Sequence, residues 1–130
     1  NYAEAQNEAV GPDGTVYAAI NQIRERAGMP DLPTGLSQSD MRERIRHERR
    51  IELAFEEHRF YDVRRWMIAD QVENTPATGI DVTKNSNGTF TYTRKVALAG
   101  KAFQTKHYWL PIPRKEILAS NNQLEQNPNY

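Results

Sequence analysis

The 130-residue sequence has no cysteine, no net charge and no long hydrophobic run. Without cysteine there is no disulfide framework, no zinc site with thiolate ligands and no cysteine nucleophile. Seventeen basic and seventeen acidic residues cancel, so no net field attracts the chain to nucleic acid or to an anionic membrane surface. No run of about 18 apolar residues is present to span a bilayer. The sequence therefore disfavours a nucleic-acid reader and leaves the cellular compartment open.

Material for a hydrophobic core is also scarce. Hydrophobic residues make up 38% of the chain, and the mean hydropathy is -0.82. The length suits one domain, but the composition is poor for a domain that folds alone. The first ten residues, NYAEAQNEAV, have neither an initiator methionine nor a signal-peptide pattern. We therefore expect residues 1–130 to be a single region of a larger protein, processed or cut short.

Helical patterns dominate the first part of the chain. Residues 2–10 read as a helix that the turn formers Gly11–Gly14 end. Over residues 15–28, apolar side chains recur at helical spacing, and Gly28 stands where a left-handed C-terminal cap is expected. This segment is predicted to be a helix.

A third helix is predicted to begin after Ser37. Ser37 is a preferred N-cap residue, and Asp40 follows three positions later, as in a capping box. The following sequence contains neither glycine nor proline as far as Ala69. The prediction is one long, charged helix over residues 38–69.

In the second half of the chain, the sequence pattern changes from helical periodicity to one typical of strands and loops. Residues 79–95 alternate apolar and polar side chains on both sides of Asn87-Gly88, which predicts a β-hairpin. Residues 108–130 begin as a short extended run with two prolines and continue as an irregular tail. The apolar side chains expected to face one another in the hairpin are Ile80, Val82, Phe90 and Tyr92. The predicted fold class is mainly α, with one small hairpin.

The long helix places charges on its apolar face. A step of about 100° per residue puts Glu48, Glu52 and Arg59 on the same face as Met41 and Ile45. Between positions 42 and 65 there are eight arginines and no lysine, and arginine binds carboxylates with two parallel hydrogen bonds where lysine does not. We therefore predict an inward-facing structural ion network. Its members are Glu48, Arg49, Glu52, Glu56, Arg59, Asp62 and Arg65.

The same stretch does not fit the metal and catalytic motifs it approaches. HERRI begins like the zinc protease motif HExxH, but Ile51 occupies the position of the second histidine. His47 and His58 have no glutamate three residues before them, so a di-iron bundle motif is absent. Glu48 and Glu52 could form an acid-and-base pair for glycoside hydrolysis, but the flanking arginines would keep both ionised. We expect no catalytic residue, no metal and no cofactor.

Aromatic residues offer candidate ligand contacts. The face of an aromatic ring can cover the apolar face of a sugar, and Tyr108 and Trp109 are the candidates for such stacking. Trp66, at the end of the charged stretch, is expected in the core.

Three segments, in this order, resemble the C-terminal part of the SusD/RagB family of outer-membrane lipoproteins of Bacteroidetes. They are INQIRERAGMP (20–30), RERIRHERRIELAFEEHRFYDVRRW (42–66) and YWLPIPRKEILASNNQLEQNPNY (108–130). The sequence departs from the family pattern at Glu57 and Asn129, where the family commonly has glycine.

The resemblance implies a tetratricopeptide-like helical protein, several times longer than this chain. Such a protein is a cell-surface lipoprotein that touches the outer membrane only through an N-terminal lipid anchor. It binds polysaccharides without cleaving them and works with a SusC-like TonB-dependent transporter in nutrient uptake. The resemblance implies that this chain is mostly scaffold.

Two other functions stay open on the sequence. One is a helical-repeat module that binds peptides or proteins. The more remote one is a glycoside hydrolase that uses Glu48 and Glu52.

Overall fold

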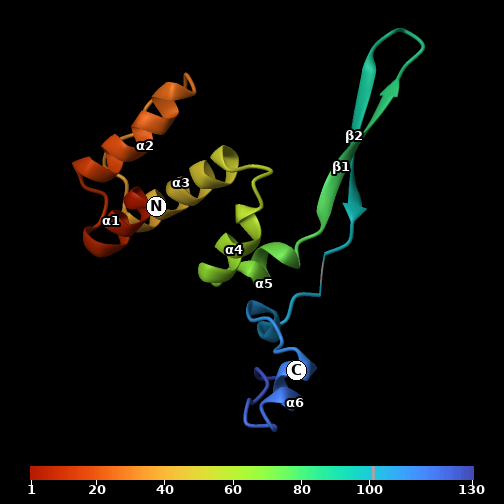
Figure 1. Cartoon of the computed structure of the whole chain (residues 1–130). Helices are drawn as coiled ribbons and strands as arrows, with labels where there is room; N and C mark the ends of the chain where they lie inside the picture. Colours follow the sequence, from red (N-terminus) through yellow and green to blue (C-terminus); the bar gives the residue numbers. More distant parts are fainter. Residues whose placement is uncertain (101) are drawn as a thin grey trace. The chain divides into compact units, whose positions relative to one another are not determined.

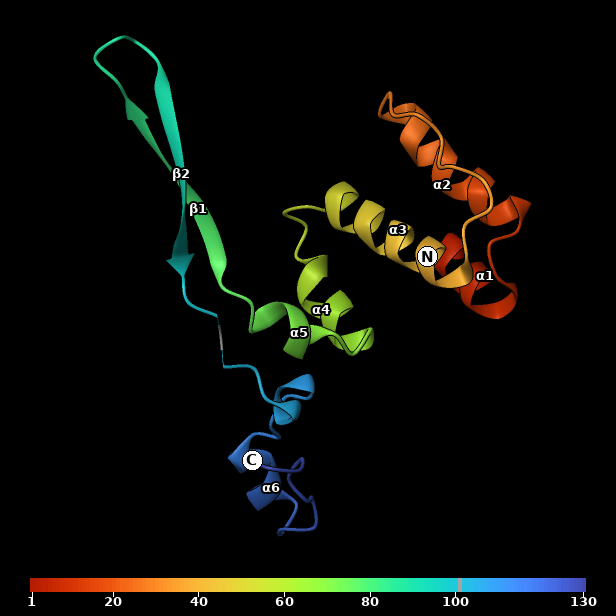
Figure 2. The ribbon, with the colours of Figure 1, turned by 180° about the vertical axis from the view of Figure 1, so that it is seen from behind.

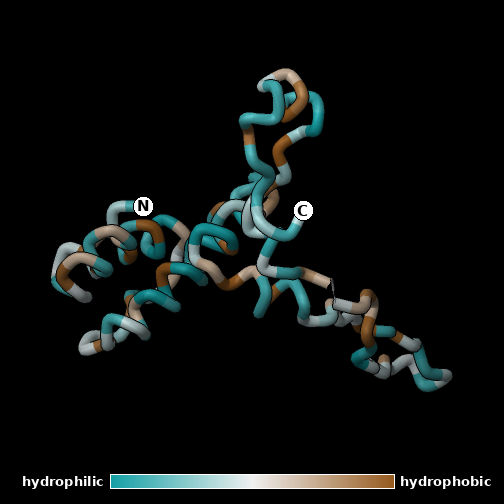
Figure 3. Tube along the Cα trace, turned by 90° about the horizontal axis from the view of Figure 1, so that it is seen from below, coloured by the Kyte–Doolittle hydropathy of each residue, from teal (hydrophilic) through white to brown (hydrophobic). Residues whose placement is uncertain are grey.

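The computed structural model describes residues 1–100 and 102–130, which form two compact units, Asn1–Arg59 and Phe60–Tyr130. The described residues are mainly helical, with one antiparallel hairpin (Figure 1). Among them, no helix combines the length and the apolar character needed to cross a membrane. Hydrophobic residues occur in short stretches along the trace (Figure 3). The elements, in chain order, are α1 (Tyr2–Val10), α2 (Gly14–Arg26), α3 (Gln38–Glu52), α4 (His58–Arg65), α5 (Ala69–Glu73), β1 (Ala77–Lys84), β2 (Phe90–Leu98), the 3-10 helix η1 (Thr105–Tyr108) and α6 (Arg114–Ala119).

The core of the first unit forms where α1, α2 and α3 meet. Val16 and Ile20 of α2 are four residues apart, as are Met41 and Ile45 of α3, so each pair lies on one face of its helix. All four side chains are buried, and Ala3 of α1 packs into the same cluster. Burying a side chain of this size contributes about 1.5–3 kcal/mol, so these few residues supply most of the apolar stabilisation of this small core.

The structure confirms the cap residues read from the sequence. The Ser37 side chain accepts a hydrogen bond from the Asp40 backbone N–H at 3.1 Å, as expected at the start of α3. Gly28 has φ 69°, and the N–H of Met29 donates to the Arg24 carbonyl oxygen. This is the left-handed ending expected after α2.

Asp13 is a cap that the sequence reasoning missed. Its carboxylate accepts hydrogen bonds from the backbone N–H groups of Thr15 and Val16 at the start of α2. The Thr15 hydroxyl and the Gln6 side-chain amide donate to it as well. Hydrogen bonds from Thr15, then from Gln6 and Val16, lower the pKa of Asp13 to about 2. The carboxylate therefore ties α1 to the first turn of α2.

The prediction of a single helix over residues 38–69 is wrong. The chain forms two helices there, α3, which ends at Glu52, and α4, and a third, α5, begins at Ala69. Phe55 and Glu57 in the connection have φ of 66° and 63°, in the left-handed region that glycine favours. No glycine or proline marks this break. The helix therefore stops at left-handed residues in a stretch whose local propensity favours its continuation.

The predicted hairpin is present in the second unit. β1 and β2 pair antiparallel and twist about each other (Figure 2). Val82 lies opposite Tyr92, as expected, whereas Ile80 lies opposite Arg94. Gly88, in the turn, has φ 82°, which explains why the Asn-Gly pair predicted the turn correctly.

In residues 108–130, side chains near the end of the segment form hydrogen bonds with the backbone of its first residues. The Gln126 side chain accepts from the Ile112 N–H at 2.8 Å and donates to the Ile112 carbonyl oxygen at 2.9 Å. The Asn127 amide donates to the Leu110 carbonyl oxygen, and the Tyr130 hydroxyl donates to that of Trp109. The tail after Ala119 is irregular, as predicted, but the sequence reasoning did not indicate α6 before it.

Candidate functional site

Two carboxylates of α3, those of Glu48 and Glu52, pair with arginines of α2. Arg24 Nη1 lies 2.7 Å from Glu48 Oε2, and the two side chains are only 14% and 13% exposed. Arg24 Nε also donates to the Pro30 carbonyl oxygen at 2.8 Å. A second pair lies further along the same two helices. Arg26 of α2 pairs with Glu52 of α3, and these side chains are 65% and 37% exposed. The two pairs join α2 to α3, the first mostly shielded from water and the second in it.

The other members of the predicted network lie in smaller groups. Arg49 donates to the Asn1 side-chain oxygen at 3.0 Å. Asp62 is buried and binds Arg65, three residues on in α4, at 2.9 Å. Both of these contacts are local to their own unit.

The break after α3 explains why these groups do not follow one helix face. Arg59 is half-buried, and Glu56 is exposed in the connection between α3 and α4. Arg24 and Arg26, which bind the two α3 carboxylates, were not in the predicted set. Helical periodicity places charges along one face of a single helix, but the partners of Glu48 and Glu52 come from α2.

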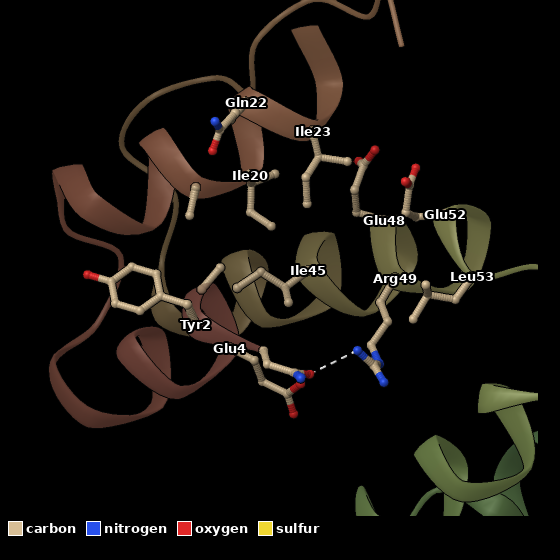
Figure 4. Close-up of a pocket in the computed structure, with 13 residues that line it drawn as sticks. Tyr2, Glu4, Ile20, Gln22, Ile23, Ile45, Glu48, Arg49, Glu52 and Leu53 are labelled. Carbon is tan, nitrogen blue, oxygen red and sulfur yellow. Dashed lines mark hydrogen bonds between the residues drawn. The ribbon is translucent and has the colours of Figure 1, made fainter. Parts of the chain in front are cut away.

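A cavity of about 310 Å³ lies between α1, α2 and α3. In Figure 4, Ile20 and Ile23 of α2 and Ile45 of α3 extend into the space between their helices. Glu48 and Glu52 line the same cavity on the α3 side. Isoleucine side chains line the inside of this cavity, and arginines bind the carboxylates of Glu48 and Glu52. The cavity therefore suits packing of apolar groups better than acid and base chemistry. No cluster of three or more His, Cys, Asp or Glu side chains that could hold a metal ion occurs among the described residues.

The two candidate stacking residues differ in exposure. The Tyr108 hydroxyl donates to Asp70 Oδ1 at 2.6 Å, and burial followed by this hydrogen bond raises the pKa of Tyr108. The Tyr108 ring meets those of Phe103 and Trp109 edge to face. Trp109 is 53% exposed, so of the two it offers the freer ring. Trp66, expected in the core, is half-buried.

A second aromatic group in this unit was missed by the sequence reasoning. The guanidinium carbon of Arg64 lies 3.5 Å from the centre of the Phe60 ring, and Arg64 Nε donates to the His107 carbonyl oxygen at 3.3 Å. The centre of the Phe103 ring lies 5.3 Å from the same guanidinium carbon. These residues line an open pocket of about 450 Å³. The available signal was the spacing of Phe60 and Arg64, which are four residues apart and therefore neighbours on one helix face.

Fold and site together define a mainly α-helical protein with ion pairs between its helices and one small β-hairpin. The chain belongs to the SusD family, because the model of that family matches residues 1–130. The solved neighbours are SusD proteins with tetratricopeptide-like helices, which confirms the predicted fold class.

Two curated relatives come from Formosa agariphila. SusD-like protein P25 is 41% identical over 96% of this chain and 21% of its own length. SusD-like protein P2 is 29% identical over 98% of this chain and 23% of its own length. The chain therefore spans less than a quarter of the length of the curated relatives it matches.

Two similar solved structures come from Bacteroides thetaiotaomicron. A SusD homolog aligns with a TM-score of 0.68 and 30% identity over 99% of this chain and 25% of its own. Surface glycan-binding protein A aligns with a TM-score of 0.60 and 25% identity over 98% of this chain and 22% of its own.

Proposed function

We propose that this chain is the C-terminal part of a non-catalytic glycan-binding protein of the SusD family. The observation that carries the proposal is the family match over residues 1–130, supported by the likeness to Surface glycan-binding protein A over 98% of the chain. The complete protein has the length of its relatives and is tethered to the outer surface of the outer membrane by a lipid anchor. It delivers glycans to a SusC-like TonB-dependent transporter for uptake.

Within that protein, this chain serves mainly as scaffold. Its shielded charges form ion pairs between its own helices, as in the Arg24–Glu48 pair. The Tyr108 hydroxyl donates a hydrogen bond to Asp70, and the Tyr108 ring contacts the rings of Phe103 and Trp109. Groups engaged in this way position the chain and are not available to a ligand without breaking internal contacts.

The non-catalytic part of the proposal rests on Glu48 and Glu52. Each carboxylate binds an arginine of α2, and a glycosidase needs one carboxyl group to deliver a proton and another to face the substrate or a water molecule. An arginine partner on both carboxylates opposes that division of roles.

Affinity gel electrophoresis of the complete protein through gels that contain single polysaccharides tests the proposal. We expect retardation by at least one polysaccharide without release of sugar from it. Trp109→Ala should leave this retardation unchanged if the chain is scaffold. Leu110→Ala, which truncates an adjacent residue that is 73% exposed, is the control.

The outcomes separate the parts of the proposal. Retardation lost in Trp109→Ala alone would move the ligand site into this chain and overturn the scaffold role. A wild-type protein that no polysaccharide retards would overturn glycan binding itself.

A further inference from the structure

The two faces of the β1–β2 hairpin differ in chemistry. Residues directly opposite each other in an antiparallel pair point to the same face. One face, here called the apolar face, carries the pairs Thr78–Val96, Ile80–Arg94, Val82–Tyr92 and Lys84–Phe90. The other, the polar face, carries Gly79–Lys95, Asp81–Thr93 and Thr83–Thr91.

The polar face is suited to water. Asp81 and Lys95 form an ion pair at 2.6 Å, and both side chains are more than half exposed. The Thr91 hydroxyl bonds with the Asn85 side chain at the end of the hairpin. Polar groups on this face thus have partners in the hairpin itself and access to solvent.

The apolar face exposes large side chains. The exposed fractions of Ile80, Val82, Phe90, Tyr92 and Val96 are 58%, 55%, 52%, 67% and 60%. Strands that alternate apolar and polar residues in this way normally pack the apolar face on a core. A two-stranded hairpin without such packing is only marginally stable. The pattern therefore indicates that another surface covers this face in the complete protein.

The size of the face favours a covering surface from the same polypeptide. Four residue pairs at about 3.4 Å per residue and about 4.8 Å between strands make a face of roughly 24 by 10 Å, or about 240 Å². A stable interface with a separate protein buries about 800 Å² of accessible surface on each partner, for which this narrow face would have to be covered almost completely. A covalently continuous chain needs no such area, because its segments are held at a high effective concentration.

The charge of the apolar face and the length of the relatives indicate what kind of surface covers this face. The apolar face carries Lys84 and Arg94 and no Asp or Glu. The relatives extend far beyond the aligned region, which is 21–25% of their length. We propose that the apolar face of the hairpin packs against the part of the same polypeptide outside residues 1–130, on an apolar strip flanked by carboxylates that face Lys84 and Arg94. This inference depends on the proposed place of the chain in a longer protein and not on the glycan that protein binds.

Cysteine labelling in the complete protein tests the proposal. Val82→Cys places a thiol on the apolar face, and Thr83→Cys places one on the polar face at the next position of β1. In a background without other reactive cysteines, we expect a maleimide to modify the folded Val82→Cys variant at least about tenfold more slowly than Thr83→Cys, because only local opening exposes a covered site. The two rates should be equal in denaturant.

Two further measurements keep the test decisive if a variant folds poorly. Arg94→Glu should lower the melting temperature of the complete protein more than Arg94→Gln does, because it places like charges together. Equal labelling rates in the folded protein would overturn the proposal. So would protection of Val82→Cys that disappears on dilution of the protein, since that would identify a second copy as the covering surface.

Discussion

Breaking the shielded ion pair between α2 and α3 should destabilise the first unit measurably. Arg24 and Glu48 are 2.7 Å apart with 14% and 13% of their side chains exposed. A hydrogen bond to a charged group contributes about 1.5–3 kcal/mol, whereas an exposed ion pair contributes about 0.2–1 kcal/mol. Because little of either side chain reaches water, we expect a coupling free energy of about 1.5–3 kcal/mol for this pair.

The structure also predicts an asymmetry between the two single substitutions. Arg24 makes a second hydrogen bond, from Nε to the Pro30 carbonyl oxygen, and Glu48→Ala leaves this bond in place. Arg24→Ala removes both, so it should cost about 1 kcal/mol more than Glu48→Ala, the usual net value of one hydrogen bond.

A double-mutant cycle by chemical denaturation of the complete protein measures these values. The cycle uses Arg24→Ala, Glu48→Ala and the double variant. The same cycle on Arg26 and Glu52 is the matched control, because that pair joins the same helices with 65% and 37% of its side chains exposed. Its coupling should stay below about 1 kcal/mol. Equal couplings for the two pairs would refute the reasoning from burial.

Two further predictions concern helix caps. Ser37→Ala should lower the free energy of unfolding by about 1 kcal/mol because the N-cap bond to the Asp40 N–H is lost, and denaturation should show no comparable loss for Thr34→Ala in the preceding loop. Asp13 has its pKa lowered from 3.8 to about 2, so its stabilising contribution is complete above pH 3.8 and is lost as the pH falls through about 2. An NMR titration of the Asp13 carboxyl carbon checks this, and a midpoint near 3.8 would contradict it.

Local signals in the sequence predicted α1, α2, the start of α3 and the hairpin. Ser37 and Gly28 act at the ends of helices through their own side chain or backbone freedom, so their effect needs no distant contact. The Asn87-Gly88 pair acts in the same way at the hairpin turn, where Gly88 has φ 82°. Such residues are reliable because the physics that selects them lies within a few positions of the chain.

The break in the charged stretch had no comparable signal. Phe55 and Glu57 adopt left-handed conformations without being glycine, and the surrounding residues are good helix formers. The family resemblance held one hint, since glycine is common in place of Glu57. A left-handed conformation at a residue other than glycine costs of order 1–3 kcal/mol, and no local pattern in this stretch predicts it.

The candidate site shows the same division. Arginine enrichment beside carboxylates predicted that the charges of α3 would be paired, but the partners Arg24 and Arg26 come from α2. Similarly, the tail residues Gln126 and Tyr130 reach back to Ile112 and Trp109.

By itself, the sequence determined the helical character, the caps at Ser37 and Gly28, the hairpin turn and the alternation of the two hairpin faces. It did so because these depend on backbone freedom, on side-chain type and on periods of 3.6 and 2 residues. Only the tertiary structure decided which charges meet, where the long stretch breaks and which rings remain exposed. Those outcomes depend on which segments, distant in sequence, come within bonding distance and exclude water from one another.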